Sequence, residues 1–109
     1  MMTDDDKVQS SGDIDQHTRL FFEAIEKGDY ATVEICLGDG IDLTVRNNMG
    51  WTALMVAVMF RKKEIVRLLV KKGVDVNAQS FSGLTALKMA EYSKNEDIVR
   101  LLKLNGAKD

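Results

Sequence analysis

The sequence predicts an all-α repeat protein, a solenoid of helix–loop–helix units joined by extended turns. The chain matches itself when it is shifted by 33 positions, so that Thr52 corresponds to Thr85 (85 − 52). The run Ile-Val-Arg-Leu-Leu at 65–69 returns at 98–102 in the same phase, with no gap. Each copy has apolar residues at helical spacing, followed by a glycine that can end the helix. A fixed period of about 20–50 residues is typical of stacked repeats, which bury a core between neighbouring units.

The period divides the chain into a tail and three units. The first unit keeps the apolar skeleton, including Ala24 and Val33, but His17 and Arg19 stand where the later units have glycine and threonine. Such a loss of turn residues is typical of a terminal, capping repeat, which has a neighbour on one side only. The expected boundaries are 1–15 for the tail and 16–46, 47–79 and 80–109 for the three units.

Two helices are expected in each of the later units. Thr52 and Thr85 precede apolar runs and can cap the backbone N–H groups of a short first helix. The second helix contains the Ile-Val-Arg-Leu-Leu run and ends before Gly73 or Gly106, where a left-handed residue is favoured. The segment 74–83, rich in Asn, Ser and Gly, is expected to form an extended turn that leads to the next unit.

The composition indicates a small soluble array. The 109 residues are 45% hydrophobic and 29% charged, as in ordinary globular proteins. The longest apolar run, 53–60, is far shorter than the roughly 20 residues that a membrane-spanning helix needs. The net charge of −2 combines −4 over residues 1–16 with +2 over the remainder. We therefore expect a solvated acidic tail and a nearly neutral body, which argues against nucleic-acid binding.

The residues also resemble a known family. The runs Gly-Trp-Thr-Ala-Leu-Met-Val-Ala at 50–57, Gly-Leu-Thr-Ala-Leu-Lys-Met-Ala at 83–90 and Glu-Ile-Val-Arg-Leu-Leu-Val-Lys-Lys-Gly-Val-Asp-Val-Asn-Ala at 64–78 resemble the ankyrin repeat. The resemblance covers residues 17–109. It implies an L-shaped stack in which the first helices line a concave face and β-turn fingers project from one edge.

The chain departs from the ankyrin pattern at two places. It has no proline after the capping threonine and no histidine two residues beyond that position. The glycine between the two helices is kept as Gly28, but it is replaced by Arg61 and Lys94 in the later units. If these two positions need a positive φ, each replacement costs about 1 kcal/mol of backbone strain.

The side chains that catalysis or metal binding would need are scarce. His17 and Cys36 are the only histidine and cysteine, so a zinc site built from such ligands is excluded. Cys36 shares the phase of core leucines and is expected to be buried. Glu64 and Asp97 begin second helices, where the helix dipole favours a negative charge. We therefore expect no enzymatic activity, metal or cofactor. The lone cysteine, with no secretory signal at the N-terminus, favours a reducing compartment, either the cytoplasm or the nucleus.

The expected function is binding of a partner protein, as an adaptor or scaffold acting through the finger tips and the concave face. The alternatives are an inhibitory or regulatory subunit that occludes an active site, and a structural spacer in a longer chain. A monomer is expected, without contact to a membrane. The resemblance implies that binding residues are those not needed for stacking: Arg46, Asn48, Met49, Trp51, Met59, Phe60, Gln79, Phe81, Ser82, Leu84, Tyr92 and Ser93.

The aromatic residues among these positions carry the binding hypothesis. Trp51, Phe60, Phe81 and Tyr92 are four of the seven aromatic residues in the chain, and aromatic side chains dominate the binding energy of many interfaces. They are expected to form one stripe along the inner edge of the stack. The alternative is that they pack across neighbouring fingers and only stabilise the array.

The resemblance further implies a modification at Asn77. Intracellular asparaginyl hydroxylases act on similar ankyrin fingers, in which a leucine precedes an Asp-Val-Asn triplet. Leu69 and the triplet 75–77 fit this arrangement. The alternative is that the Asn77 side chain only forms hydrogen bonds within its own turn.

Overall fold

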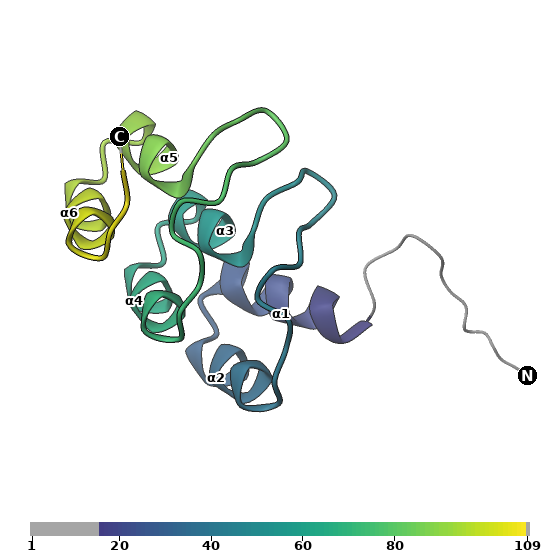
Figure 1. Ribbon diagram of the computed structural model, residues 1–109. Helices are drawn as coiled ribbons and strands as arrows, with labels where there is room; N and C mark the ends of the chain where they lie inside the picture. The colour runs from purple at the N-terminus through teal and green to yellow at the C-terminus, as the bar shows by residue number, and fades with distance from the viewer. Residues whose placement is uncertain (1–15, 109) are drawn as a thin grey trace, which may run out of the picture.

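A computed structural model describes residues 16–108, so the expected acidic tail at 1–15 lies outside the described residues. The described chain folds into six α-helices arranged as three pairs (Figure 1). The helices are α1 (Gln16–Lys27), α2 (Tyr30–Gly38), α3 (Ala53–Met59), α4 (Lys63–Lys71), α5 (Ala86–Tyr92) and α6 (Glu96–Leu104).

The helices stack in two rows. The first helices of the pairs, α1, α3 and α5, lie side by side, and the second helices, α2, α4 and α6, form a row beneath them (Figure 1). The loops that follow α2 and α4 extend past the first helices on the side away from the second row (Figure 1). None of the helices in the described part of the chain is long and apolar enough to cross a membrane.

The predicted threonine caps start the first helices. The Thr52 hydroxyl accepts a hydrogen bond from the Met55 backbone N–H at 3.3 Å, and the Thr85 hydroxyl accepts one from the Lys88 N–H at 3.2 Å. The Met55 sulfur in turn accepts from the Thr52 N–H at 3.5 Å. A thioether therefore completes the cap of α3, at the position where the family favours histidine.

The turn between the two helices of each unit needs a left-handed residue. Gly28 has φ 76°, Arg61 has φ 59° and Lys94 has φ 57°. The positive φ considered for the two non-glycine positions is therefore present, and it carries a cost because a Cβ crowds the backbone in this conformation. Arg61 has a contact that offsets part of this cost, because its Nη1 donates to the Ser93 carbonyl at 3.1 Å. Gly73 and Gly106, with φ 91° and 96°, follow the second helices as predicted.

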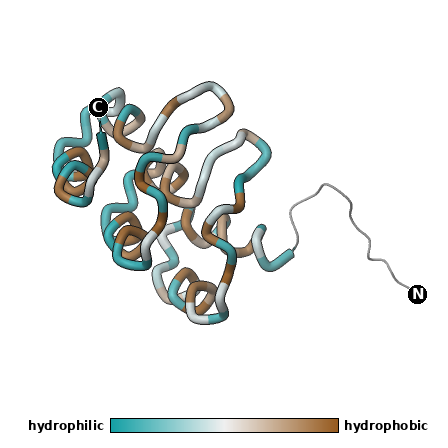
Figure 2. Tube along the Cα trace, viewed as in Figure 1, coloured by the Kyte–Doolittle hydropathy of each residue, from teal (hydrophilic) through white to brown (hydrophobic). Residues whose placement is uncertain are grey.

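One core runs through the whole stack. Figure 2 shows the apolar stretches concentrated in the helices, while the tips of the loops are mostly polar or intermediate. Cys36 belongs to this core with 2% of its surface exposed, as expected. Burial raises the pKa of its thiol, which therefore stays protonated and unreactive at neutral pH. The largest buried side chains include Phe21, Ile25, Leu54, Leu69, Leu87, Ile98 and Leu102.

Candidate functional site

Two short fingers project between the units. An isolated antiparallel bridge joins Arg46 to Thr52 in the first finger, and another joins Gln79 to Thr85 in the second. The tips close by equivalent turns: the Gly50 N–H donates to the Asn47 carbonyl at 2.9 Å, and the Gly83 N–H to the Ser80 carbonyl at 2.9 Å. We refer to residues 46–52 as finger 1 and residues 79–85 as finger 2. The predicted extended turns are therefore narrow hairpins rather than open loops.

Arg46 ties the two fingers together. Its Nη1 donates to the Gly50 carbonyl at 2.7 Å and to the Gln79 carbonyl of finger 2 at 2.6 Å. The side chain is half-buried. A guanidinium that satisfies two backbone carbonyls has lost much of its freedom to bind another molecule. This contact fixes the spacing of the fingers, a role that the sequence analysis missed.

Five of the predicted binding residues are large, apolar and exposed. We call them the exposed apolar set: Met49 (62% exposed), Met59 (42%), Phe60 (44%), Phe81 (78%) and Tyr92 (73%). Their positions divide the set into two groups. Met49 and Phe81 lie on the fingers, whereas the other three lie at the C-terminal ends of α3 and α5. The seven residues of α3 separate its two ends by about 10 Å.

Phe81 is exposed and also packs on the neighbouring finger. A Cβ built on Gly50 would lie 2.4 Å from Cγ and Cδ2 of the Phe81 ring. The ring therefore rests against finger 1 at a point where only glycine leaves room, while 78% of its surface stays open to solvent. One edge of the ring therefore packs on the neighbouring finger, as the alternative to the binding hypothesis expected. The rest of its surface is open and available to a partner.

The side chains of three predicted binding residues, Trp51, Leu84 and Ser93, make contacts within the fold. Trp51 and Leu84 are half-buried and pack against the core. The Ser93 hydroxyl donates to the carbonyls of Met89 and Ala90 at 3.0 and 3.2 Å. The predicted stripe is therefore narrower than expected, because Trp51 and Leu84 do not stand free at the inner edge.

The remaining predicted residues are polar and lie on the finger tips. Asn48, Gln79 and Ser82 are exposed. The Gln79 carbonyl accepts from Arg46, and the Ser82 hydroxyl lies 3.0 Å from that of Ser80. Asn48 precedes Met49 in finger 1, and Gln79 lies two residues before Phe81 in finger 2.

Asn77 joins the base of finger 2 to the last described residues. Its Nδ2 donates to the Gly106 carbonyl at 3.0 Å, and its Oδ1 accepts from the Lys108 N–H at 2.9 Å. The turn itself is held by Asp75, whose Oδ1 accepts from the Asn77 N–H at 2.9 Å. The alternative that the Asn77 side chain forms hydrogen bonds within its own turn is therefore wrong. The side chain bonds instead to the next unit, at Gly106 and Lys108.

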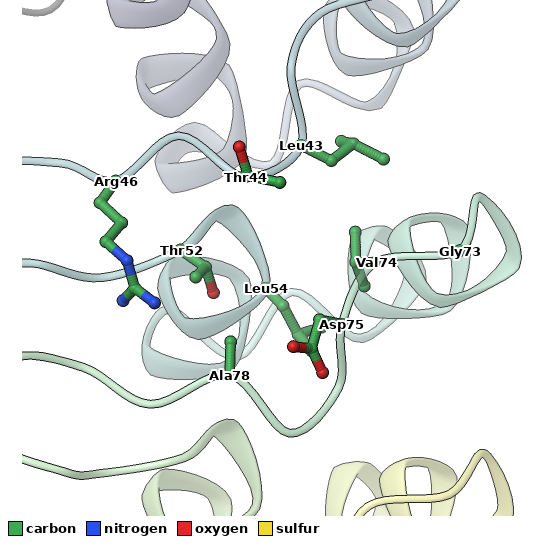
Figure 3. Close-up of a pocket in the computed structure, with 9 residues that line it drawn as sticks. All are labelled: Leu43, Thr44, Arg46, Thr52, Leu54, Gly73, Val74, Asp75 and Ala78. Carbon is green, nitrogen blue, oxygen red and sulfur yellow. The ribbon is translucent and has the colours of Figure 1, made fainter.

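A pocket of ≈ 270 Å³ lies in the seam between the loops that lead into the two fingers (Figure 3). Its only acid is Asp75, which already accepts a hydrogen bond, and its Thr52 hydroxyl caps α3. The pocket therefore does not bring together a nucleophile, a base and an open polar cavity. The lining residues are Leu43, Thr44, Arg46, Thr52, Leu54, Gly73, Val74, Asp75 and Ala78.

Comparison with known families agrees with this architecture. The family model described as Ankyrin repeats (3 copies) matches residues 21–109. The chain belongs to the ankyrin-repeat family. The resemblance read from the sequence is confirmed, and so is the predicted all-α solenoid of helix pairs. A comparison with curated proteins found no match.

Membership of the ankyrin family gives the general class of function. Ankyrin repeats are protein–protein interaction modules and are typically non-catalytic. In this ankyrin stack, the finger tips and the C-terminal ends of α3 and α5 are among the surfaces that stacking leaves exposed.

Proposed function

We propose that this ankyrin stack is an adaptor that binds a partner protein through the exposed apolar set. The observation that carries the proposal is the exposure of Phe81 and Tyr92, at 78% and 73%. Exposed aromatic side chains of this size are typical of binding sites, because burying them in a complex removes a large apolar area from water. Asn48, Gln79 and Ser82 are the polar border of the proposed site, in keeping with the polar rim of most interfaces.

The finger group is the proposed centre of binding. Phe81 rests on Gly50, so one side of its ring is already packed before a partner arrives, which restricts its motion. A side chain that is fixed in advance loses less conformational entropy on binding, which makes it a stronger anchor. Met49 lies in the turn of the adjacent finger and adapts its shape to a partner more readily, as methionines do.

The partner must first be recovered by affinity capture from cell extract on the purified chain. Phe81→Ala and Tyr92→Ala should each weaken binding to that partner by about 2 kcal/mol, as hot-spot truncations do. Leu104→Ala is the matched control, because Leu104 is 80% exposed but lies on α6, in the row of second helices. Calorimetry with each variant measures the change in affinity.

Stability must be measured alongside affinity. Phe81→Ala should leave the unfolding midpoint nearly unchanged, whereas Leu68→Ala removes a side chain that is 7% exposed and should cost about 2–5 kcal/mol. Trp51→Ala is expected to lower both affinity and stability, because Trp51 is half-buried against the core. Equal losses of affinity from Phe81→Ala and Leu104→Ala would contradict the proposed site.

The same partner distinguishes the adaptor from its alternatives. If the partner is an enzyme whose activity falls in proportion to occupancy, the chain is an inhibitory subunit. The spacer alternative predicts that capture of proteins does not depend on Phe81. If the wild-type chain captures no protein, or captures only proteins that the Phe81→Ala variant captures equally well, the proposed function is wrong.

A further inference from the structure

The two ends of the stack present different faces. The middle helix α3 lies between α1 and α5, so both of its sides are covered (Figure 1). A position that is buried in the middle unit but exposed in the first unit faces away from the other two units. A position that is buried in the middle unit but exposed in the third unit faces the opposite way. Equivalent residues, 33 apart, therefore identify the side chains on each end.

The first end face keeps apolar side chains. Leu20 is 50% exposed, whereas its equivalent Ala53 is 1% exposed. Ile35 is 63% exposed, whereas its equivalent Leu68 is 7% exposed. Glu23 is exposed at a position where the middle unit buries a valine completely. We define the first end face by Leu20, Glu23 and Ile35.

The second end face mixes charge with an apolar position. Lys88 is exposed where the middle unit has Met55, which is 1% exposed. Glu91 is exposed where the middle unit buries a valine. Val99 is half-buried, whereas its equivalent Val66 is fully buried. We define the second end face by Lys88, Glu91 and Val99.

The two faces match when a second copy continues the stack. Packing the first end face of one copy on the second end face of another repeats the junction that already joins the first and middle units. Val33 and Leu68 are buried at that junction, with 0% and 7% exposed. In the new junction, Val99 of one copy takes the place of Val33, and Ile35 of the other takes the place of Leu68.

The charges are complementary in the same arrangement. Two periods separate the third unit from the first, so Lys88 aligns with position 22 of α1 in the added copy (88 − 66). Along the axis of α1, Glu23 of the added copy therefore lies one residue, or about 1.5 Å, from the level of Lys88. The nearest cation on that face, Arg19, lies three residues away on the other side. Glu91 aligns with position 25, two residues from Glu23, so it is farther from this carboxylate than Lys88 is.

The alternative symmetric contact is disfavoured. A twofold contact between two first end faces, or between two second end faces, repeats no junction of the stack and leaves the apolar position of the other end face uncovered. The head-to-tail contact instead repeats an existing junction, brings Lys88 near Glu23, and covers both Ile35 and Val99.

We propose that this chain associates with second copies of itself, head to tail, through the first end face of one copy and the second end face of the next. The contact joins two different surfaces, so each added copy leaves a free face at either end and association does not stop at a dimer. The proposal replaces the monomer expected from the sequence. It uses a surface separate from the exposed apolar set.

Sedimentation velocity of the full chain over a concentration series, at low ionic strength, tests the proposal. The weight-average sedimentation coefficient of the wild type should rise continuously past the value for a dimer. Glu23→Lys and Lys88→Glu should each weaken association about tenfold, because each places like charges at every junction. An equimolar mixture of the two variants should restore association, because both junctions that join one variant to the other pair opposite charges.

Phe81→Ala is the control and should leave self-association unchanged, which separates this proposal from the proposed function. A wild type that sediments as one species at all concentrations overturns the head-to-tail contact. So does association that ends at a dimer, or a mixture that stays as weak as its components.

Photo-crosslinking identifies what covers the first end face. A photoreactive residue in place of Ile35 should link to the α6 segment around Val99 of another copy. Isotope-labelled and unlabelled chains, mixed before irradiation, distinguish links between copies from links within one chain. A link to residues 1–15 of the same chain, or to the first end face of a second copy, overturns the proposal.

Discussion

Three positions between the helices of a unit share one backbone conformation and differ only in side chain. Gly28, Arg61 and Lys94 all have φ between 57° and 76°. Glycine adopts this region without strain, and any residue with a Cβ does so at a cost of about 1–2 kcal/mol. The conformation is therefore imposed by the packing of the two helices and not by the residue that occupies the turn.

Lys94→Gly should raise the free energy of unfolding by about 0.5–1 kcal/mol, because relief of strain outweighs the extra chain entropy of glycine. Chemical denaturation measures the change. Lys94→Ala is the control, since alanine removes the lysine side chain but keeps the Cβ, and it should give no gain. A lower stability for Lys94→Gly would show that the lysine side chain has a stabilising contact.

Asn77 should be hydroxylated by an intracellular asparaginyl hydroxylase, as the ankyrin pattern around it implies. The Lys108 N–H and the Gly106 carbonyl hold its amide, so the finger must release both bonds before an enzyme reaches it. Lys108→Pro removes one donor and should speed the reaction. Peptide mass spectrometry after incubation measures the added oxygen atom; an unshifted mass in both chains contradicts the prediction.

At the scale of the element, α3 and α5 begin at the two threonine caps that the sequence predicted. Thr52 and Thr85 are both in extended conformation, with ψ 169° and 166°, and α3 and α5 begin at the next residue. Extended backbone is the conformation that a following proline requires. The first helical position also tolerates proline, because its N–H has no partner within the helix.

Ala53→Pro and Ala86→Pro should each stabilise the fold by about 0.4–1 kcal/mol, because proline restricts the unfolded chain. Thermal unfolding measures the gain. Ala57→Pro, in the middle of α3, is the matched control and should cost about 3 kcal/mol or more. A drop in the midpoint for both first-position variants would show that proline does not fit the packing around these helix starts.

Two carboxylates at turns make stability depend on acid pH. Hydrogen bonds from the side chain and the backbone of Thr32 hold the pKa of Asp29 below its ordinary value of 3.8. The Thr44 side chain and backbone lower the pKa of Asp42 in the same way. The unfolded chain then binds more protons than the folded chain near this pH. The contribution is complete above the unfolded pKa and is lost as the pH falls through the folded value.

The double variant Asp29→Asn, Asp42→Asn should therefore lose less stability than the wild type between about pH 5 and about pH 3. Asparagine keeps an acceptor oxygen for the cap, so the neutral-pH stability should change little. Unfolding midpoints across this range provide the measurement. Parallel curves for the two proteins would show that these carboxylates do not contribute to acid sensitivity.

At the scale of the whole molecule, stability belongs to the junctions between units. The core is continuous from α1 to α6, and the middle unit contacts both others. Repeat arrays of this kind gain stability from neighbouring interfaces as well as from each unit. A short array therefore unfolds as one body when its middle unit is intact.

Leu69→Ala in the middle unit should lower the free energy of unfolding by about 2–5 kcal/mol, because Leu69 is fully buried. Hydrogen exchange should show that α1 and α6 lose protection together, since each unit depends on the middle one. Leu104→Ala, at an exposed position, should change neither quantity. Loss of protection confined to α3 and α4 would show that the units unfold independently.

The sequence by itself determined the number of units, the order of the helices and most of the core. These features repeat every 33 residues and rest on local chemistry: apolar residues at helical spacing and a glycine stop in every copy, and a threonine cap in the second and third copies. The strain at Arg61 and Lys94 was also predictable, because both replace a glycine in a fixed phase.

Only the tertiary structure decided which finger residues are free. Arg46 and Trp51 looked available, yet Arg46 bonds a carbonyl of the next finger and Trp51 packs on the core. Asn77 likewise bonds residues 29 and 31 positions away. The side chains of Arg46 and Asn77 are not repeated in the other units, and each bonds to the backbone of an adjacent unit. The periodic pattern cannot encode them, because their geometry exists only after the units have stacked.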